Sequence, residues 1–142
     1  MIILDTNVLL EPMRTKGDPA VAAWLDRQAR GSLYLTAVTL AELFLGLGLL
    51  PLGRRRSMLE ARIGDALAVF DERRTLTFDI KAARCFAVLI ARARASGHTI
   101  GVADGQIAAI AASHGFTVAT RDTAPFAAAG VPAIDPWNSG PA

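Results

Sequence analysis

The chain opens with MIILDTN (residues 1–7), an unbroken apolar run that meets one acidic and two polar residues. A short, continuous apolar run is typical of a strand that is covered on both faces of its sheet. In open α/β sheets, ligands bind beyond the carboxyl ends of the strands. The stretch therefore predicts a buried strand over residues 2–4 that brings Asp5 to a functional edge, although an acidic residue after a strand also often caps the next segment.

Outside this stretch, runs typical of strands alternate with runs typical of helices. The further strands are expected over residues 33–36, 75–78, 116–120 and 132–134. The helices are expected over residues 19–30, 37–50, 57–70, 80–95 and 103–114. Strands that follow one another in parallel need such helical crossovers, so the alternation indicates a mainly parallel sheet. We therefore predict an α/β fold, a three-layer α/β/α sandwich that forms a single domain over residues 1–142.

Local signals mark several of the expected helix starts. Asp18 before Pro19 is an N-cap followed by proline at the first helical position. Ser57 with Glu60 three residues later has the spacing of a capping box. The helix expected over residues 37–50 is almost wholly apolar, so we expect most of it to be buried.

Composition is that of an ordinary globular domain, since 52% of the 142 residues are apolar. A single cysteine, Cys85, cannot build a disulfide framework. No apolar run reaches the roughly 18–20 residues that a membrane-crossing helix needs, and the opening run is too short for a signal peptide. We therefore expect a cytoplasmic protein that does not enter a membrane.

Four acidic residues stand at the expected strand ends and helix starts. Asp5 follows the first strand, and Asp122 follows the strand over residues 116–120. Asp104 opens the helix before that strand, and Glu42 lies early in the helix after the second strand. Three of the four have a simpler alternative role as helix caps, whereas Glu42 stands in an apolar helix, where an unpaired carboxylate is costly to bury. Because parallel strands share one carboxyl edge, we expect the four carboxylates to converge there.

Carboxylates gathered in this way repel one another and raise one another's pKa values, and a divalent cation removes that conflict. Oxygen ligands without cysteine or histidine favour Mg²⁺ or Mn²⁺ over zinc. Such a metal polarises a phosphate and activates water, which suits phosphodiester hydrolysis. Thr6, Asn7 and Thr120 are placed to hydrogen-bond the ligands or the attacking water.

The stretches MIILDTNVLLEP (1–12), TAVTLAELFLG (36–46), VADGQIAAIAASHGFTVATRD (102–122) and DPW (135–137) together resemble PIN-domain proteins. More narrowly, the chain resembles the VapC-type toxins of bacterial type II toxin–antitoxin systems, in particular their FitB-like branch. The resemblance covers nearly the whole chain, and the order of the motifs is far more specific than DTN alone.

The resemblance implies a metal-dependent endoribonuclease that a small cognate antitoxin holds inactive. It implies that Asp5, Glu42, Asp104 and Asp122 form the catalytic acidic quartet, with Mg²⁺ or Mn²⁺ on Asp5, Asp104 and Asp122. Polar positions in the same motifs match Thr6, Asn7, Thr120 and Arg121, which are expected to contact the ligands or the substrate. The resemblance further implies a homodimer that contacts DNA only through its antitoxin.

One stretch departs from the family pattern. Many members read TRN here and carry an aspartate directly before the phenylalanine, whereas this chain reads TRDTAPF (120–126). Asp122 occupies the asparagine position, and Pro125 stands where the aspartate is expected. Only one acid remains in the loop, so the fourth ligand and a second metal ion are less certain than the rest of the site.

The charge pattern fits a phosphate-bearing partner once the quartet is set aside. If metal neutralises four acids, 15 basic residues face nine remaining acidic ones, a net of +6. GRRRS (53–57) is the densest basic cluster, with Arg121 as another candidate, although such a cluster is often simply a solvated surface. The same acidic edge favours an antitoxin segment that places a basic side chain, such as arginine, against the quartet.

Two other functions were weighed. A phosphatase that uses an aspartate after its first strand needs a second aspartate two residues later, where this chain has Asn7, and the only lysines are Lys16 and Lys81. The alternative from another class is a nuclease-fold binding subunit of a DNA-binding toxin–antitoxin regulatory complex, with weak or no nuclease activity. The departure in the 120–126 stretch keeps that alternative open.

Overall fold

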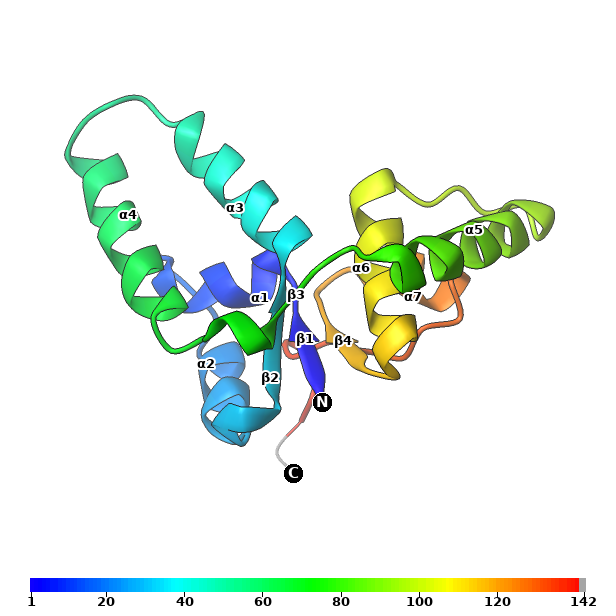
Figure 1. Ribbon diagram of the computed structural model, residues 1–142. Helices are drawn as coiled ribbons and strands as arrows, with labels where there is room; N and C mark the ends of the chain where they lie inside the picture. Colours follow the sequence, from blue (N-terminus) through cyan, green and yellow to red (C-terminus); the bar gives the residue numbers. More distant parts are fainter. Residues whose placement is uncertain (141–142) are drawn as a thin grey trace.

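The computed structural model describes residues 1–140 of the chain. Its centre is a five-stranded sheet in the order β3-β2-β1-β4-β5, in which every neighbouring pair is parallel (Figure 1). The strands are β1 (Ile2–Leu4), β2 (Leu33–Thr36), β3 (Thr75–Leu76), β4 (Thr117–Ala119) and β5 (Ala133–Ile134). β1 is the central strand, and the three-layer α/β/α architecture is confirmed. Residues 141–142, which the single-domain prediction includes, lie outside the described residues.

Helices cover both faces of the sheet, as Figure 1 shows. On one side lie α1 (Thr6–Leu10), α2 (Pro19–Asp26), α3 (Ala37–Gly48) and α4 (Arg54–Leu67). On the other side lie α5 (Ile80–Ala95), α6 (Val102–His114) and α7 (Ala124–Ala128). Short 3-10 turns, η1 (Glu11–Met13), η2 (Arg30–Ser32) and η3 (Glu72–Arg74), join some of these elements.

The central strand feeds a separate core on each face of the sheet. Successive side chains of a strand point to opposite faces, so Ile3 packs among α5, α6 and α7 while Leu4 packs among α1, α2 and α4. Both side chains are at most 2% exposed. Burial on two faces explains why the opening run of the chain is apolar without alternation.

Three local features fix the edge where the strands end. Leu4 pairs with Ala119 in the parallel register, so the residues that follow β1 and β4 lie side by side. Thr36 ends β2 and caps α3, because its hydroxyl accepts a hydrogen bond of 3.0 Å from the Thr39 N–H. α6 packs closely on α5 at Gly105, where an added Cβ would meet side-chain atoms of the α5 helix at 3.0 Å.

The structure corrects several expected boundaries. The strands predicted over 75–78 and 116–120 are shorter, and the helix predicted over 19–30 ends at Asp26. α4 starts three residues before Ser57, so the predicted capping box is wrong; the Glu60 carboxylate instead accepts a hydrogen bond of 3.1 Å from Arg56 Nε. The sequence analysis also missed α1, the 3-10 turns and α7.

The prediction that the helix over residues 37–50 is largely buried is wrong. Of its large apolar side chains, Leu43 is buried, whereas Phe44, Leu45 and Leu49 are 52%, 64% and 75% exposed. α3 and α4 extend together from the sheet as a helical arm, which has too little neighbouring structure to cover both helices (Figure 1).

Among the described residues, no helix combines the length and apolar character that crossing a membrane requires.

Candidate active site

Asp5 lies directly after the central strand and is held by hydrogen bonds on both carboxylate oxygens. Its Oδ1 accepts a bond of 2.9 Å from the Thr6 N–H and so caps α1. Its Oδ2 accepts a bond of 2.8 Å from the Thr120 hydroxyl, which follows β4. The residue is only 8% exposed. Asp5 therefore caps a helix and also lies at the carboxyl edge, so the two roles weighed from sequence coexist.

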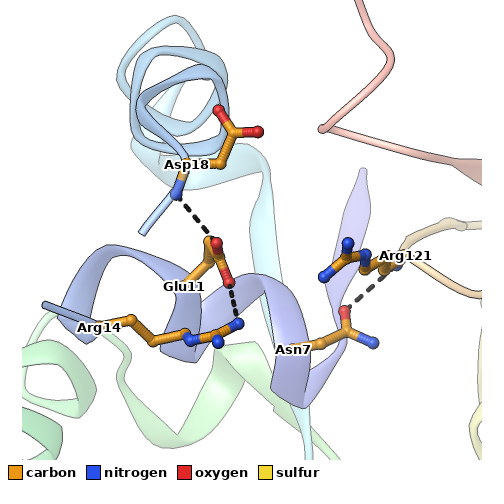
Figure 2. Close-up of polar contacts among 5 residues, drawn as sticks. All are labelled: Asn7, Glu11, Arg14, Asp18 and Arg121. Carbon is orange, nitrogen blue, oxygen red and sulfur yellow. Dashed lines mark hydrogen bonds and ion pairs between the residues drawn. The ribbon is translucent and has the colours of Figure 1, made fainter. Parts of the chain in front are cut away.

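Asn7 ties together the two loops at this edge. Its Nδ2 lies 3.5 Å from Asp5 Oδ2 and 3.5 Å from Thr120 Oγ1. Its Oδ1 accepts a hydrogen bond of 3.2 Å from the backbone N–H of Arg121 (Figure 2). The N–H of Asp122 in turn donates to Thr120 Oγ1 at 3.2 Å. The structure thus brings five of the residues expected at the site into one connected network around Asp5.

The other two acids sit on helices that begin at the same edge. Asp104 lies in the first turn of α6 and Glu42 in the second turn of α3. Burial raises the pKa of Glu42 above its ordinary value, and the negative charges of Asp5 and Asp104 raise it further. Burial likewise raises the pKa of Asp104, with smaller contributions from Asp5 and Asp122. These mutual effects place the four carboxylates within electrostatic reach of one another.

The donor set at this edge fits a hard divalent cation, but not as an enclosed cage. Within residues 1–140, no three acidic, histidine or cysteine side chains lie close enough together to hold an ion directly. Mg²⁺ usually retains several waters and binds through only one or two carboxylates, so a more open arrangement suits it. The Thr6 hydroxyl at this edge is buried without a hydrogen-bond partner, which leaves a polar atom for a ligand or water.

Asp122 is more exposed than Asp5, and its carboxylate contacts the adjacent backbone instead of the other site residues. Its Oδ1 accepts a hydrogen bond of 3.3 Å from the Ala124 N–H, at the start of α7, and the residue is exposed. The N-cap residue of α7 is Thr123, so this contact forms a local turn before the helix, and the simpler capping role that the sequence also allowed for Asp122 is wrong.

The sequence analysis missed a second buried carboxylate, Glu11. It is 5% exposed, and its two oxygens accept hydrogen bonds from the Asp18 N–H at 2.9 Å and from Arg14 Nη1 at 3.2 Å (Figure 2). The bond from the Asp18 backbone is the main cause that lowers the pKa of Glu11 below its ordinary value, with further contributions from Arg14 and Trp137. An acid inside the apolar run VLLEP was the signal that could have revealed it.

Trp137 connects this carboxylate to the loop after β4. The Arg121 guanidinium lies over the Trp137 ring, 5.2 Å from its centroid, and such a contact favours the cation. The backbone N–H of Trp137 donates to Asp135 Oδ1 at 2.9 Å, which explains the DPW motif as a turn that places Trp137. Arg121 is therefore positioned from two sides, by Asn7 at its backbone and by Trp137 at its side chain.

Comparison with known proteins gives consistent results. The family model described as PIN domain matches residues 2–131. The chain is 50% identical to VapC ribonuclease Y4jK of Sinorhizobium fredii, over 97% of this chain and 99% of that protein. It is 43% identical to toxin FitB of Neisseria gonorrhoeae, over 97% of this chain and 99% of that protein.

Solved structures give the same picture. A structure of FitAB bound to an IR36 DNA fragment contains a chain that superposes with a TM-score of 0.92 at 43% identity. The match covers 97% of this chain and 96% of that one. Similarity of this extent includes the sheet and both helical layers.

Proposed function

Because the chain belongs to the PIN-domain family, in the group of toxin FitB and VapC ribonuclease Y4jK, we propose that it is the endoribonuclease toxin of a toxin–antitoxin pair. The observation that carries this proposal is the fixed carboxylate of Asp5 at the carboxyl edge, with three further acids in electrostatic reach. The whole chain acts as one nuclease domain. Its substrate is RNA, and its reaction is hydrolysis of a phosphodiester bond.

We assign Mg²⁺ or Mn²⁺ to the oxygens of Asp5, Asp104 and Asp122. When bound, the metal supplies a Lewis acid for the phosphate and an activated water. Thr120 and the Thr6 N–H hold the Asp5 carboxylate in one orientation, which keeps the ligand ready before substrate arrives. Glu42 completes the catalytic quartet: its raised pKa suits a group that accepts a proton from the attacking water.

Arg121 is the residue at this edge that we assign to the substrate phosphate. A guanidinium binds phosphate through two parallel hydrogen bonds. Because Arg121 already stacks on Trp137, its side chain loses less conformational entropy when it binds phosphate. Asn7 acts through the loop, because it fixes the backbone of Arg121 next to the acids. In this proposal the acidic edge activates the water, and the Arg121 guanidinium beside it holds the phosphate.

We further propose a cognate antitoxin as the partner that controls the site. Its inhibitory segment places a basic side chain, such as arginine, against the four carboxylates, since a cation there relieves the repulsion that raises the pKa values of Glu42 and Asp104. The FitAB complex on DNA supports a DNA contact made through the antitoxin. A homodimer is the expected state of the toxin itself.

The test is RNA cleavage by the purified chain after removal of any antitoxin. We expect cleavage of structured RNAs with Mg²⁺ or Mn²⁺, lost with a chelator and lost in Asp5→Asn and Asp104→Asn variants. Equal cleavage by the wild type and both variants would reveal a contaminating nuclease. Toxicity on expression without a partner gives a simpler first readout.

A second function has one observation in its favour. Within the described residues, no three acidic, histidine or cysteine side chains lie close enough together to hold a metal ion directly. A protein that serves mainly as the binding subunit of a DNA-binding regulatory complex would show no cleavage in any metal, yet would still bind its antitoxin. The cleavage experiment therefore separates the two functions.

A further inference from the structure

A groove runs between the end of α1 with the turn that follows it and the start of α4. Its volume is about 860 Å³, and its lining includes five cationic side chains: Arg14, Lys16, Arg54, Arg55 and Arg62. No acidic residue lines it. Met13 and Met58 are among the apolar side chains between the cations. The groove is therefore strongly positive, and the predicted GRRRS cluster contributes two of its five charges.

Most of these charges lack a partner within the protein. Arg14 pairs with Glu11 at 3.2 Å, and Arg62 donates to the Met13 carbonyl at 3.0 Å. For Lys16, Arg54 and Arg55 there is no ion pair or side-chain hydrogen bond in the described part of the chain. Five like charges around one hollow repel one another, so an anionic occupant would stabilise the groove.

The position of Arg54 and Arg55 adds a second unfavourable electrostatic interaction to this repulsion. Both lie in the first turn of α4, which starts after Gly53 without a side-chain cap and without an acidic residue. The helix dipole makes that end positive, so cations there are unfavourable and anions are favoured. Two cations are therefore kept where local helix stability disfavours them.

We propose that this groove binds the phosphates of the RNA strand beside the scissile bond, an inference that rests on the proposed function. Asp5 caps the start of α1, which ends at Leu10 in the lining of the groove, and its five helical residues rise only roughly 7 Å. Four carboxylates repel phosphate, so the substrate needs cations outside them. The groove supplies such cations, and its lining residue Leu10 lies on the short helix that Asp5 caps.

The arrangement of the charges favours a nucleic acid over an acidic protein segment. Cations lie on both sides of the groove: Arg14 and Lys16 come from the turn after α1, and Arg54, Arg55 and Arg62 come from α4. An RNA strand, which has one negative charge at every nucleotide, contacts both sides of the groove at once. The apolar side chains between them offer a surface for base faces without any hydrogen-bond readout, which predicts binding with little sequence preference.

The experiment measures RNA binding separately from cleavage. An Asp5→Asn background without metal is titrated against a fluorescein-labelled, unstructured 20-nucleotide RNA, by anisotropy, at several salt concentrations. The groove variant adds Arg54→Gln and Arg55→Gln. The matched control instead adds Arg92→Gln and Arg94→Gln, which removes the same charge from the exposed surface of α5.

We expect the groove variant to bind about 25-fold more weakly than its parent at 0.1 M salt, because two lost contacts each change the single-strand salt exponent by about 0.7. The salt slope should fall by about 1.4, and the control should stay within about twofold of the parent. Circular dichroism checks that the groove variant stays folded, which is expected because the change relieves the clash with the helix dipole.

Equal affinity and equal salt slope in the parent and the groove variant would overturn the proposal. So would poly-glutamate of matched charge that binds more tightly than RNA and loses affinity in the groove variant, because the groove would then serve an acidic protein segment. Neither result depends on cleavage. Failure of the nuclease proposal shows instead as absence of Asp5-dependent cleavage by the parent chain with metal.

Discussion

At the scale of single residues, the site depends on how tightly Asp5 is held. The Thr120 hydroxyl is fully buried and contacts Asp5, Asn7 and the Asp122 N–H at once. This one side chain joins the loop after β1 to the loop after β4. A buried hydroxyl with three contacts is difficult to replace, since any substitute of the same shape leaves polar groups without partners.

Thr120→Val tests this role. The variant keeps the shape but loses the 2.8 Å bond to Asp5 Oδ2. We expect kcat for RNA cleavage to fall about 10- to 100-fold, as for other groups that orient metal ligands, with KM little changed. Unfolding free energy should fall by about 1–3 kcal/mol. Thr120→Ser keeps the hydroxyl and should restore most of kcat; a valine variant with wild-type kcat contradicts the positioning role.

Glu11 is the second residue whose environment makes a sharp prediction. Its pKa is lowered, so its contribution to stability is present above the ordinary value of 4.5 and is lost as pH falls through the lowered value. Glu11→Gln should lower the unfolding free energy by about 1.5–3 kcal/mol at pH 7, because the amide keeps one acceptor but faces Arg14 with its NH₂.

Denaturant titrations at pH 7 and pH 3 measure this effect. The difference between wild type and Glu11→Gln should be smaller at pH 3 than at pH 7, because the stability from the carboxylate is lost as pH falls through its lowered pKa. Glu72→Gln, a change at an exposed residue of a short 3-10 turn, is the control and should have little effect at either pH. A difference that stays constant between the two pH values would rule out the charged form of Glu11 as its source.

At the scale of elements, the sequence predicts those features that depend on hydrophobic periodicity and local helix caps. It misses those that depend on contacts between distant segments. Asp18 caps α2 as expected, because the bond is local: its Oδ1 accepts from the Ala20 N–H. Asp79 caps α5 in the same local way, since its Oδ1 accepts from the Ala82 N–H. α1 is only five residues long, too short for a periodic signal, and depends on Asp5 as its cap. Four acids at one edge were predictable from strand order, whereas Glu11 and the Trp137–Arg121 contact depend on packing between distant segments.

The exposed face of α3 shows the same limit. Its apolar pattern predicted burial, yet Leu45 and Leu49 are 64% and 75% exposed, and Leu52 in the next turn is 87% exposed. Apolar side chains gathered on a projecting arm mark an interaction surface. The apolar pattern predicted burial within the domain, whereas the structure leaves this face open to solvent as a candidate surface for another chain.

The homodimer is therefore expected to form through this arm. Leu45→Glu with Leu49→Glu should convert the protein to a monomer in light scattering at micromolar concentration, because two charges would be buried without partners. Val88→Glu on α5, which is 55% exposed, serves as the control and should leave the dimer intact. A monomeric wild type, or a dimer that survives the double change, contradicts this interface.

At the scale of the whole molecule, the acidic edge is a stability cost that a cation removes. The folded-state pKa values of Glu42 and Asp104 are raised, so the folded chain binds more protons than the unfolded chain above pH 4. Stability from these two groups is therefore greatest below their ordinary values of 4.5 and 3.8, and it decreases as pH rises through the raised values.

Asp104→Asn separates this effect from the rest of the fold. In chelator at pH 7, the variant should melt about 1–3 °C above wild type, because one partly buried and repelled charge is gone, and the gap should narrow as pH falls through the raised pKa of Asp104. With Mg²⁺ at pH 7, the order should reverse, since wild type keeps a ligand that the variant lacks. Asp65→Asn on exposed α4 is the control and should show neither change. A variant that melts below wild type in chelator at pH 7 would mean that Asp104 stabilises α6 as a first-turn acid more than it strains the acidic edge.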